Sequence, residues 1–330
     1  MRCLAAWDET HDVRSFLLAP EDGGRIAYSP GQFITLRVPG PDGEPVERCY
    51  TLSSSAAGER TATITVKKKP GGVLSGHLHA TLTPGTSIEV FGPSGQFGPA
   101  AVDEKYLLLS AGSGVTPMLS VIRTAADLGI DLDATFLHAA RTEHDLIARD
   151  DLAAFARRLP RLRLLTVASR ANGTWAGERG RLDTGVLGRL VSDLASRTVL
   201  CCGPEGFMAA MREACLALGV APNRYFEESF DFGEVEVEVP ADGPLHRITF
   251  AKSGKTFDCP ENLTILQAAR LAGVPMPSSC AKGVCGTCKC MKTSGSVDMN
   301  HGGGIRDREV ARGFILPCSS RPLSDIVLDR

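Results

Sequence analysis

The sequence lacks an excess of charge of either sign, because 36 lysines and arginines oppose 38 aspartates and glutamates for a net charge of -2. Proteins that hold nucleic acid or an anionic membrane through their overall field need a basic excess, so neither partner is expected. No apolar run approaches the roughly 20 residues of a membrane-spanning helix. Met1-Arg2-Cys3 does not begin a secretory signal peptide, and there is no internal repeat or low-complexity segment.

Cysteine is the residue that the chain has in unusual supply, with 11 among 330 residues. An odd number without a secretory signal argues against a disulfide framework and for a reducing, cytoplasmic compartment. At about 150 residues per domain, the length alone predicts a little over two domains. Hydrophobic residues make up 43% of the chain, which is enough to form real cores.

Residues 1–99 have the pattern of a small antiparallel β-barrel. Apolar and β-branched segments such as 32–38 and 61–66 alternate with Gly- and Pro-containing turns such as 39–43. Short strands at this spacing are typical of all-β domains with a closed sheet.

Residues 100–232 alternate between strand and helix patterns. The continuous apolar run at 106–110 is expected to be a strand buried on both faces. Further strands are expected at 134–137, 162–167 and 198–202, with helical patterns between them. This alternation predicts an α/β domain with a doubly wound parallel sheet.

The C-terminal part is separated from the rest by an acidic stretch. Residues 226–242 carry seven acidic residues and no basic one, and we interpret the segment 233–244 as a solvated linker. Residues 245–330 then form an α+β module, with a hairpin at 247–258 and a short helix through Ala272 that Asn262 or Thr264 caps.

Four cysteines in this last module follow the plant-type [2Fe-2S] spacing Cys-x4-Cys-x2-Cys, with the fourth cysteine 29 residues further on. The expected cluster ligands are Cys280, Cys285, Cys288 and Cys318. Structural zinc is the weaker alternative, because zinc ribbons use two close Cys-x-x-Cys pairs and this chain has one. A Rieske centre needs two histidine ligands, so His301 is interpreted as a turn residue.

Neighbouring residues support the cluster interpretation. Gly283 and Gly286 would let backbone N–H groups approach the sulfur atoms and tune the reduction potential. Cys290 lies outside the ligand spacing and is expected to pack in the core.

A flavin site is predicted by two motifs in the N-terminal part. Arg48 and Tyr50 share one face of a strand, so a guanidinium can bind a diphosphate while the phenol ring packs against an aromatic cofactor. The hydroxyl of Thr51 can hydrogen-bond a flavin ring nitrogen. Gly72 begins a helical pattern whose backbone N–H groups, together with the hydroxyl of Ser75, can hold phosphate. The predicted flavin-binding residues are Arg48, Tyr50, Thr51, Leu52, Gly72, Val73 and Ser75.

The run Lys67-Lys68-Lys69 lies between these two motifs. It is interpreted as a solvated turn, and a basic patch for an acidic partner is the alternative.

A nicotinamide coenzyme site is predicted where strands of the parallel sheet end. Gly112 permits a tight turn and Gly114 lets a pyrophosphate approach the backbone, while Pro117 is tolerated in the first helical turn. Cys202 ends another strand and is expected to face the same cleft, with a core cysteine such as Cys201 as the alternative. The predicted coenzyme-binding residues are Gly112, Gly114, Thr116, Pro117, Arg170, Cys202, Gly203 and Pro204.

Together these motifs, with Gly92-Pro93-Ser94-Gly95-Gln96-Phe97, resemble the ferredoxin–NADP reductase superfamily, in particular members with a C-terminal plant-type ferredoxin domain. The resemblance covers nearly the whole chain. It implies an FAD phosphate on Arg48, the flavin ring on Tyr50 and flavin N5 beside Thr51. It also implies that Cys202 borders the nicotinamide, so that Thr51 and Cys202 are the catalytic residues. Phe230 would cover the flavin, and residues 245–330 would adopt a β-grasp fold.

Three shorter motifs narrow this resemblance. Segments 8–13, 299–305 and 316–323 look like reductase components of Rieske-type monooxygenases, especially those acting on glycine betaine, stachydrine or carnitine. This similarity implies a reductase that passes electrons from NADH through FAD and a [2Fe-2S] cluster to a separate terminal oxygenase. A monomer is expected because soluble shuttling reductases are often monomers. Reductases of hybrid-cluster proteins share the domain order and are an alternative.

The three predicted sites form a consistent relay. A nicotinamide gives up two electrons as a hydride and a [2Fe-2S] cluster accepts one at a time, so a flavin must stand between them. Ser169-Arg170 could bind a 2′-phosphate, which leaves NADPH open as an alternative to NADH. A non-catalytic electron-transfer subunit of a dehydrogenase is the second alternative. Relatives of that kind have their last cysteines closer together than the 29-residue gap seen here.

Overall fold

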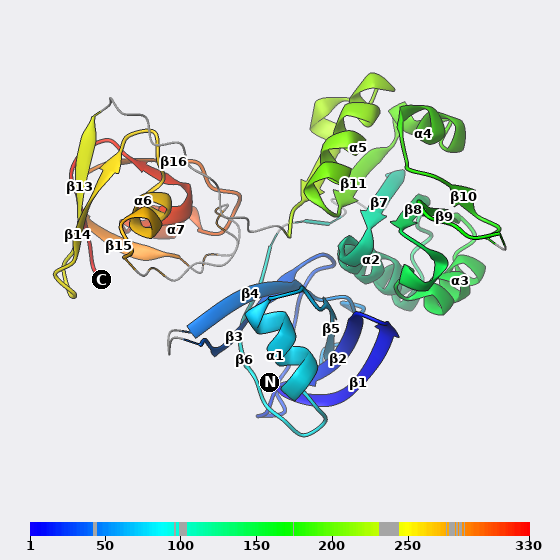
Figure 1. Cartoon of the computed structure of the whole chain (residues 1–330), viewed down its shortest axis with the longest axis horizontal. Helices are drawn as coiled ribbons and strands as arrows, with labels where there is room; N and C mark the ends of the chain where they lie inside the picture. The colour runs from blue at the N-terminus through cyan, green and yellow to red at the C-terminus, as the bar shows by residue number, and fades with distance from the viewer. Residues whose placement is uncertain are drawn as a thin grey trace. The chain divides into compact units, whose positions relative to one another are not determined.

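The computed structural model describes residues 1–41, 45–95, 97–98, 104–173, 175–230, 244–274, 276, 281, 283, 286 and 288–330. Its contacts divide the chain into two compact units (Figure 1). One unit contains residues 1–46, 50–93 and 97–231, and the other contains residues 47–49, 94–96 and 232–330. The predicted linker 233–244 lies, except for Pro244, outside the described residues.

The N-terminal part consists of two three-stranded sheets. The first sheet has the order β1 (Arg2–Thr10), β2 (Val13–Ala19), β5 (Ala62–Lys67), with antiparallel pairing. The second has the order β4 (Pro45–Thr51), β3 (Phe33–Pro39), β6 (Glu89–Ser94). Side chains of both sheets, such as Phe16 and Leu36, share one core with Leu74 and Leu78 of α1 (Val73–Thr81). Burying these side chains is what holds the short strands together.

A six-stranded parallel sheet follows. Its order is β10 (Glu178–Arg179), β9 (Leu162–Ala168), β8 (Ala134–Ala140), β7 (Tyr106–Ala111), β11 (Thr198–Cys202), β12 (Tyr225–Glu228). The central strand β7 is apolar on both faces, because Leu107 and Leu109 belong to one core and Tyr106 and Leu108 to another.

Helices cover both faces of this sheet. The helices are α2 (Val115–Leu128), α3 (Arg149–Arg158), α4 (Thr184–Leu190) and α5 (Glu205–Ala217). Side chains of α2 and α3 pack in the core that contains Leu108, and side chains of α4 and α5 pack in the core that contains Leu107. Figure 1 shows α2 and α3 together and α4 and α5 together. The doubly wound arrangement is the one expected from the alternation of patterns.

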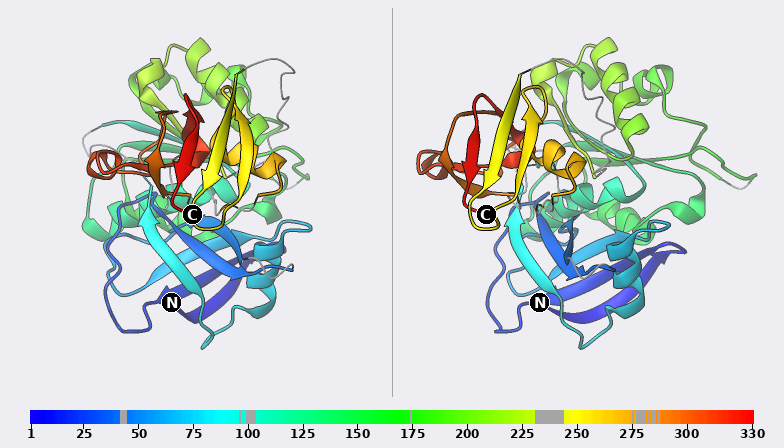
Figure 2. Two further views of the ribbon diagram at one scale, coloured as in Figure 1. Left: turned by 90° about the vertical axis from the view of Figure 1, so that its left-hand side faces the viewer. Right: turned by 60° about the vertical axis from the view of Figure 1, so that its left-hand side comes forward.

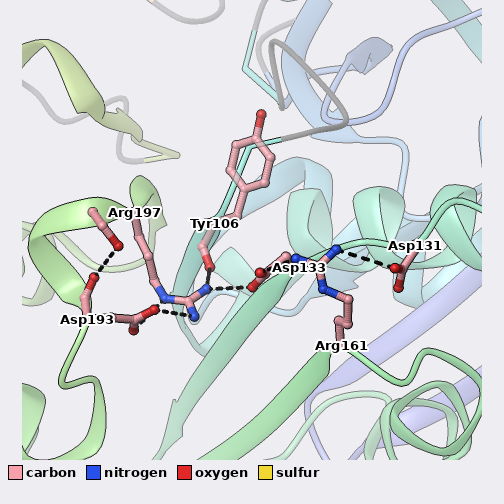
Figure 3. Close-up of polar contacts among 7 residues, drawn as sticks. Tyr106, Asp131, Asp133, Arg161, Asp193 and Arg197 are labelled. Carbon is pink, nitrogen blue, oxygen red and sulfur yellow. Dashed lines mark hydrogen bonds and ion pairs between the residues drawn. The ribbon is translucent and has the colours of Figure 1, made fainter.

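Charged side chains tie the amino ends of the strands together (Figure 3). The guanidinium of Arg197, a residue only 9% exposed, donates to both carboxylate oxygens of Asp193 at 2.8 Å. It also donates to the carbonyl oxygen of Tyr106 and to Asp133 Oδ1, both at 3.1 Å. Arg161 forms a further ion pair with Asp133. Four of the five N–H groups of this buried guanidinium have acceptors, so the network holds together the end of the sheet that faces away from the predicted coenzyme site.

The described residues of the C-terminal unit form a five-stranded sheet, a two-stranded sheet and two short helices. The larger sheet has the order β14 (Thr256–Pro260), β13 (Leu245–Phe250), β19 (Ile326–Leu328), β15 (Cys290–Ser294), β17 (Phe314–Ile315). The smaller sheet pairs β16 (Val297–Met299) with β18 (Ser320–Pro322), and the helices are α6 (Ile265–Leu271) and α7 (Asp307–Val310). Figure 2 shows the last strand, β19 in red, beside the yellow hairpin β13–β14.

Local signals in this unit follow the sequence. The expected hairpin is formed by β13 and β14, and Thr264 rather than Asn262 caps α6. Gln267 completes a capping box by accepting from the backbone N–H of Thr264 at 2.9 Å. Gly273 ends the helix with φ of 66°. In the part of the chain that the structure describes, no helix is long and apolar enough to cross a membrane.

Candidate functional site

The predicted flavin motif lies on β4 and leaves one hydroxyl unsatisfied. Arg48 is exposed, Tyr50 is half-buried and Thr51 is only 4% exposed. The Oγ atom of Thr51 is buried and has no hydrogen-bond partner among the described residues. Burying a hydroxyl without a partner costs about 1–3 kcal/mol, so this position fits a site that a ring nitrogen of a bound flavin completes.

The second flavin motif forms the start of α1. Gly72 is the N-cap, and the backbone N–H groups of the first turn have no acceptor within the helix. The hydroxyl of Ser75 accepts from the backbone N–H of Lys69 at 3.1 Å, and a Cβ on Gly72 would lie 2.7 Å from it. Ser75 therefore shapes the loop, and the backbone N–H groups of Val73 and its neighbours are the donors left for a phosphate.

Helix α2 holds the segment 53–56, which directly follows the flavin motif. Ser120 and Arg123 donate to backbone carbonyl oxygens of this segment at 3.0 and 2.7 Å. Thr124 accepts from a backbone N–H of the segment at 2.8 Å. Sequence reasoning missed these three residues, which share one face of α2 at a spacing of three and four residues.

Two glycine turns interlock at the carboxyl edge of the parallel sheet. Gly112 has φ of 54°, and an added Cβ would meet nothing within 4 Å. A Cβ on Gly114 would lie 2.2 Å from the carbonyl oxygen of Cys202, and a Cβ on Gly203 would lie 2.8 Å from Phe207. Gly114 is thus needed for close packing against the end of β11. The sequence had suggested approach of a pyrophosphate as its role.

The first turn of α2 is fixed by its own side chains. Thr116, which is 2% exposed, donates to the carbonyl oxygen of Ser113 at 3.0 Å. Pro117 is buried in this turn, where it has no intrahelical hydrogen bond to lose. These contacts pre-form the turn that the coenzyme is predicted to contact.

A cleft of about 460 Å³ opens at this edge of the sheet. Gly112 and Pro204 line it, as do three cationic side chains, Lys67, Arg141 and Arg181. Helices begin at both glycine turns, so their N–H groups and these cations suit the diphosphate of a dinucleotide.

Of the predicted pair Ser169-Arg170, one residue lines this cleft and the other does not. Ser169 lines the cleft, whereas Arg170 does not belong to its lining, and the backbone N–H of Arg170 donates to the carbonyl oxygen of Arg141 at 2.7 Å. The cationic side chains of the lining therefore come from positions other than Arg170.

A row of polar side chains crosses four adjacent strands beside the glycine turns. His138, Ser110, Cys202 and Glu228 are register neighbours on β8, β7, β11 and β12. Ser110 Oγ lies 2.7 Å from His138 Nδ1, and both residues are fully buried. Burial lowers the pKa of His138 to about 4 and raises the pKa of Glu228 to about 8.

The thiol of Cys202 belongs to the same neutral row. Burial and then the charge of Glu228 raise the pKa of Cys202 well above its ordinary value. Cys202 and Cys201 belong to cores on opposite faces of the sheet, and Phe230 packs against the core that contains Cys202. At neutral pH the row is therefore uncharged. Cys202 is fully buried and does not belong to the lining of the cleft, so its thiol lies in the core, the alternative reading, and not on the cleft that it was expected to face.

Two of the four predicted cluster ligands lie in the described part of the chain. Cys288 and Cys318 are 2% and 6% exposed, and their Sγ atoms are 3.2 Å apart. That separation is too long for a disulfide of about 2.05 Å. The backbone N–H of Gly283 donates to Cys318 Sγ at 3.2 Å. Converging thiols with a backbone donor suit an iron–sulfur cluster, while Cys280 and Cys285 lie outside the described residues.

The segment Asn300–Gly304 packs against the cysteine loop. The carbonyl oxygen of Gly283 accepts from the backbone N–H groups of Gly302 and Gly304 at 3.1 and 2.9 Å. A Cβ on Gly286 would lie 2.7 Å from the carbonyl oxygen of Gly304. This contact gives a structural reason for glycine at position 286, because any side chain there would collide with the backbone of Gly304. His301 is a turn residue, as expected, because its Nδ1 accepts from the N–H of Gly303 at 3.2 Å.

Comparison with known proteins agrees with the three predicted cofactors. Family models for an oxidoreductase FAD-binding domain, an oxidoreductase NAD-binding domain and a 2Fe-2S iron-sulfur cluster binding domain match residues 5–98, 108–213 and 248–323. Phthalate dioxygenase reductase has a similar fold, with a TM-score of 0.60 and 24% identity over 100% of this chain and 97% of that one.

Two curated relatives match from end to end. The glycine betaine monooxygenase reductase subunit of Pseudomonas aeruginosa is 37% identical over 100% of this chain and 94% of its own length. The stachydrine N-demethylase reductase subunit of Rhizobium meliloti is 39% identical over 100% of this chain and 96% of its own length. The chain therefore belongs to the family of FAD-, NAD- and [2Fe-2S]-dependent oxidoreductases that includes these monooxygenase reductase subunits.

Proposed function

We propose that this chain is the reductase of a two-component oxygenase. It passes electrons from NADH through FAD and a [2Fe-2S] cluster to a separate Rieske-type terminal oxygenase that acts on a quaternary ammonium compound. The observation that carries the proposal is that one chain matches the family models of all three cofactor-binding domains and matches the glycine betaine and stachydrine reductase subunits along its whole length.

The proposed domains follow the motifs. Residues 1–99 form an FAD-binding β-barrel and residues 100–232 form the coenzyme domain. A linker at 233–244 leads to a β-grasp ferredoxin domain at 245–330. The two N-terminal sheets with a shared core, and the mixed sheet with α6, support these assignments.

Each proposed site residue has a separate role in the reaction. Bound FAD accepts two electrons at once and releases them singly. Arg48 binds its diphosphate, Tyr50 packs against its ring, and the unpartnered hydroxyl of Thr51 hydrogen-bonds a ring nitrogen. The neutral thiol of Cys202 borders the nicotinamide without adding charge beside it. Cys280, Cys285, Cys288 and Cys318 hold the cluster.

NADH is the proposed coenzyme, and NADPH is the alternative. Arg170, the cation expected to bind a 2′-phosphate, does not line the cleft, which supports NADH. Arg141 and Arg181 do line it, and either could take that place. Comparing kcat/KM for NADH and NADPH tests the preference, and a higher value for NADPH would reverse it.

The partner is proposed to bind transiently, and the reductase is proposed to be a cytoplasmic monomer with neither a nucleic acid nor a membrane partner. The near-zero net charge supports the absence of nucleic acid and membrane partners. The described cysteines form no disulfides, which supports the cytoplasmic location. A reductase of a hybrid-cluster protein or an electron-transfer subunit of a dehydrogenase are the competing functions.

Reconstitution tests the proposed function. The purified chain is mixed with the oxygenase component of a glycine betaine or stachydrine system, and NADH consumption is followed. We expect consumption that requires both the oxygenase and the quaternary ammonium compound. NADH consumption that depends on neither the oxygenase nor the quaternary ammonium compound would contradict the proposal. Consumption that appears only with a hybrid-cluster protein would contradict it too.

A further inference from the structure

Segment 53–56 follows the flavin motif directly and is bonded to the first N-terminal sheet. The backbone N–H of Ser53 donates to the carbonyl oxygen of Thr63 in β5 at 2.8 Å. The backbone N–H of Thr63 donates in turn to Ser54 Oγ at 2.7 Å. Because Thr51 lies only two residues before Ser53, the placement of this segment fixes the placement of the hydroxyl that is predicted to meet the flavin.

Arg123 connects the same segment to two helices of the nucleotide domain. Its Nη1 atom donates to the carbonyl oxygen of Ser53 at 2.7 Å, and its Nη2 atom donates to Asp151 Oδ2 of α3 at 2.7 Å. The side chain of Arg123 is only 14% exposed. A guanidinium is planar and its donors have fixed directions, so a single side chain sets the arrangement of Ser53, α2 and α3.

Two further side chains of α2 strengthen this attachment. Ser120 Oγ donates to the carbonyl oxygen of Ser54 at 3.0 Å, and Thr124 Oγ1 accepts from the backbone N–H of Ala56 at 2.8 Å. Ser120 and Thr124 are both buried, so a broken bond would leave a backbone group without a partner at a cost of about 1–3 kcal/mol. The segment therefore cannot slide along α2 without a large loss of stability.

Helix α2 also begins at the predicted coenzyme site. Its first residue, Val115, directly follows the turn Gly112–Gly114. Arg123 lies nine residues after Gly114, which is about 14 Å along a helix that rises 1.5 Å per residue. Because α2 is a continuous helix over this length, its bonds to segment 53–56 set the separation between the predicted flavin and coenzyme positions.

We propose that Arg123 is a positioning residue for the transfer of a hydride from NADH to FAD. The hydride carries two electrons from the nicotinamide to the flavin ring, so NADH is oxidised to NAD+ and FAD is reduced. Such a step needs reacting atoms about 3–3.5 Å apart, and a displacement of about 1 Å costs on the order of 100-fold in rate. Arg123 acts on this separation through Ser53. The inference rests on the proposed function, in which NADH reduces FAD.

The test compares the holoenzyme variants Arg123→Met and Arg158→Met. Arg158 is the matched control, because it is an exposed arginine of α3 that donates to the carbonyl oxygen of Ala126 in α2 at 3.3 Å. In anaerobic stopped-flow mixing with saturating NADH, we expect the rate of flavin reduction per bound FAD to fall about tenfold in Arg123→Met. In Arg158→Met the rate should change less than twofold.

The kinetic isotope effect and a conservative variant identify the step that is affected. With NADH deuterated at the transferred position, the primary isotope effect should be larger in Arg123→Met than in wild type, because hydride transfer limits the rate more strongly. Arg123→Lys can donate to Ser53 but cannot present the same fork to Asp151, so it should recover part of the rate.

Two measurements without turnover separate positioning from coenzyme binding. Hydrogen–deuterium exchange of peptides that cover residues 53–56 should be faster in Arg123→Met and unchanged in Arg158→Met. Calorimetric titration with ADP-ribose, which lacks the nicotinamide, should give a Kd within twofold of wild type for both variants, because the turn Gly112–Gly114 is unchanged.

Four outcomes would overturn the inference. They are an unchanged rate per bound FAD in Arg123→Met, an equal fall in Arg158→Met, unchanged hydrogen exchange, and a tenfold weaker Kd for ADP-ribose, which would assign Arg123 to coenzyme binding. Failure of the wild-type holoenzyme to oxidise NADH would instead contradict the proposed function. An active wild type with an equally active Arg123→Met would contradict only the role of Arg123.

Discussion

At the scale of single residues, Thr51 gives the strongest structural support for the predicted flavin site. The sequence marks it as part of a motif, and the structure adds that its hydroxyl is buried with no partner among the described residues. Thr51→Val keeps the shape and removes the hydroxyl, so we expect an unchanged or slightly higher Tm. Turnover of NADH with ferricyanide should fall about tenfold, because the bond to the flavin ring is lost. Thr51→Ser, which restores the hydroxyl, should recover most of the rate; an unchanged rate in Thr51→Val would contradict the assignment.

His138 makes a prediction about pH at the same scale. Burial lowers its pKa to about 4, against the opposing hydrogen bond with Ser110, while the unfolded chain has a value near 6.5. Between these values the unfolded state binds the proton more readily, so stability falls as the pH drops from 6.5 to 4. The loss is on the order of 3 kcal/mol for a group buried this completely.

Thermal unfolding at several pH values checks this expectation. His138→Gln can still hydrogen-bond Ser110 and should lose less stability than wild type between pH 6.5 and 4. His144→Gln is the matched control, because the side chain of His144 is 82% exposed and should leave the slope unchanged. Parallel curves for His138→Gln and wild type would show that His138 does not set the acid limit.

At the scale of elements, the glycine turn before α2 shows that a sequence motif can identify a glycine without revealing why the fold needs it. The motif marks both Gly112 and Gly114, but only the fold shows that Gly114 packs against the backbone of Cys202. Gly114→Ala should destabilise the protein by about 1–3 kcal/mol through overpacking, although the φ of Gly114 is an ordinary −63°. Gly112→Ala should cost about 1 kcal/mol, because it adds only the strain of a left-handed conformation. Urea unfolding compares them, and a larger loss for Gly112→Ala would contradict this division of roles.

Other elements show why sequence reasoning reached its limit. The apolar run at 106–110 and its alternation with helices predicted the parallel sheet, because burial on both faces leaves a local signal. The contacts of Ser120 and Arg123 with segment 53–56 were missed, since each polar residue by itself looks like ordinary helix surface. Lys67 likewise looked solvated, because its partner Asp12 and the cleft come from distant segments.

At the scale of the whole molecule, cysteine spacing was the most informative feature. Cluster ligands lie at characteristic separations along the chain, so the sequence alone reveals their pattern. The sequence does not reveal the fold that closes the site. The structure brings Cys288 and Cys318 together across the gap that the spacing predicted. The packing of segment 300–304 against Gly283 could not be predicted. A glycine in a sequence indicates a close backbone approach, but it does not indicate which segment approaches.

The relay itself is tested by removing one cluster ligand. In Cys285→Ser we expect NADH-to-ferricyanide activity within twofold of wild type, because the flavin and coenzyme sites are intact. Reduction of cytochrome c, which needs single electrons from the cluster, should fall by more than tenfold, and the cluster absorption should disappear while the flavin bands remain. Cys290→Ser is the matched control, since Cys290 is a buried cysteine at the start of β15, two residues after Cys288 and outside the ligand spacing. If Cys285→Ser kept both activities equally, electrons would not pass through the cluster, and the chain could not serve a terminal oxygenase in the way proposed.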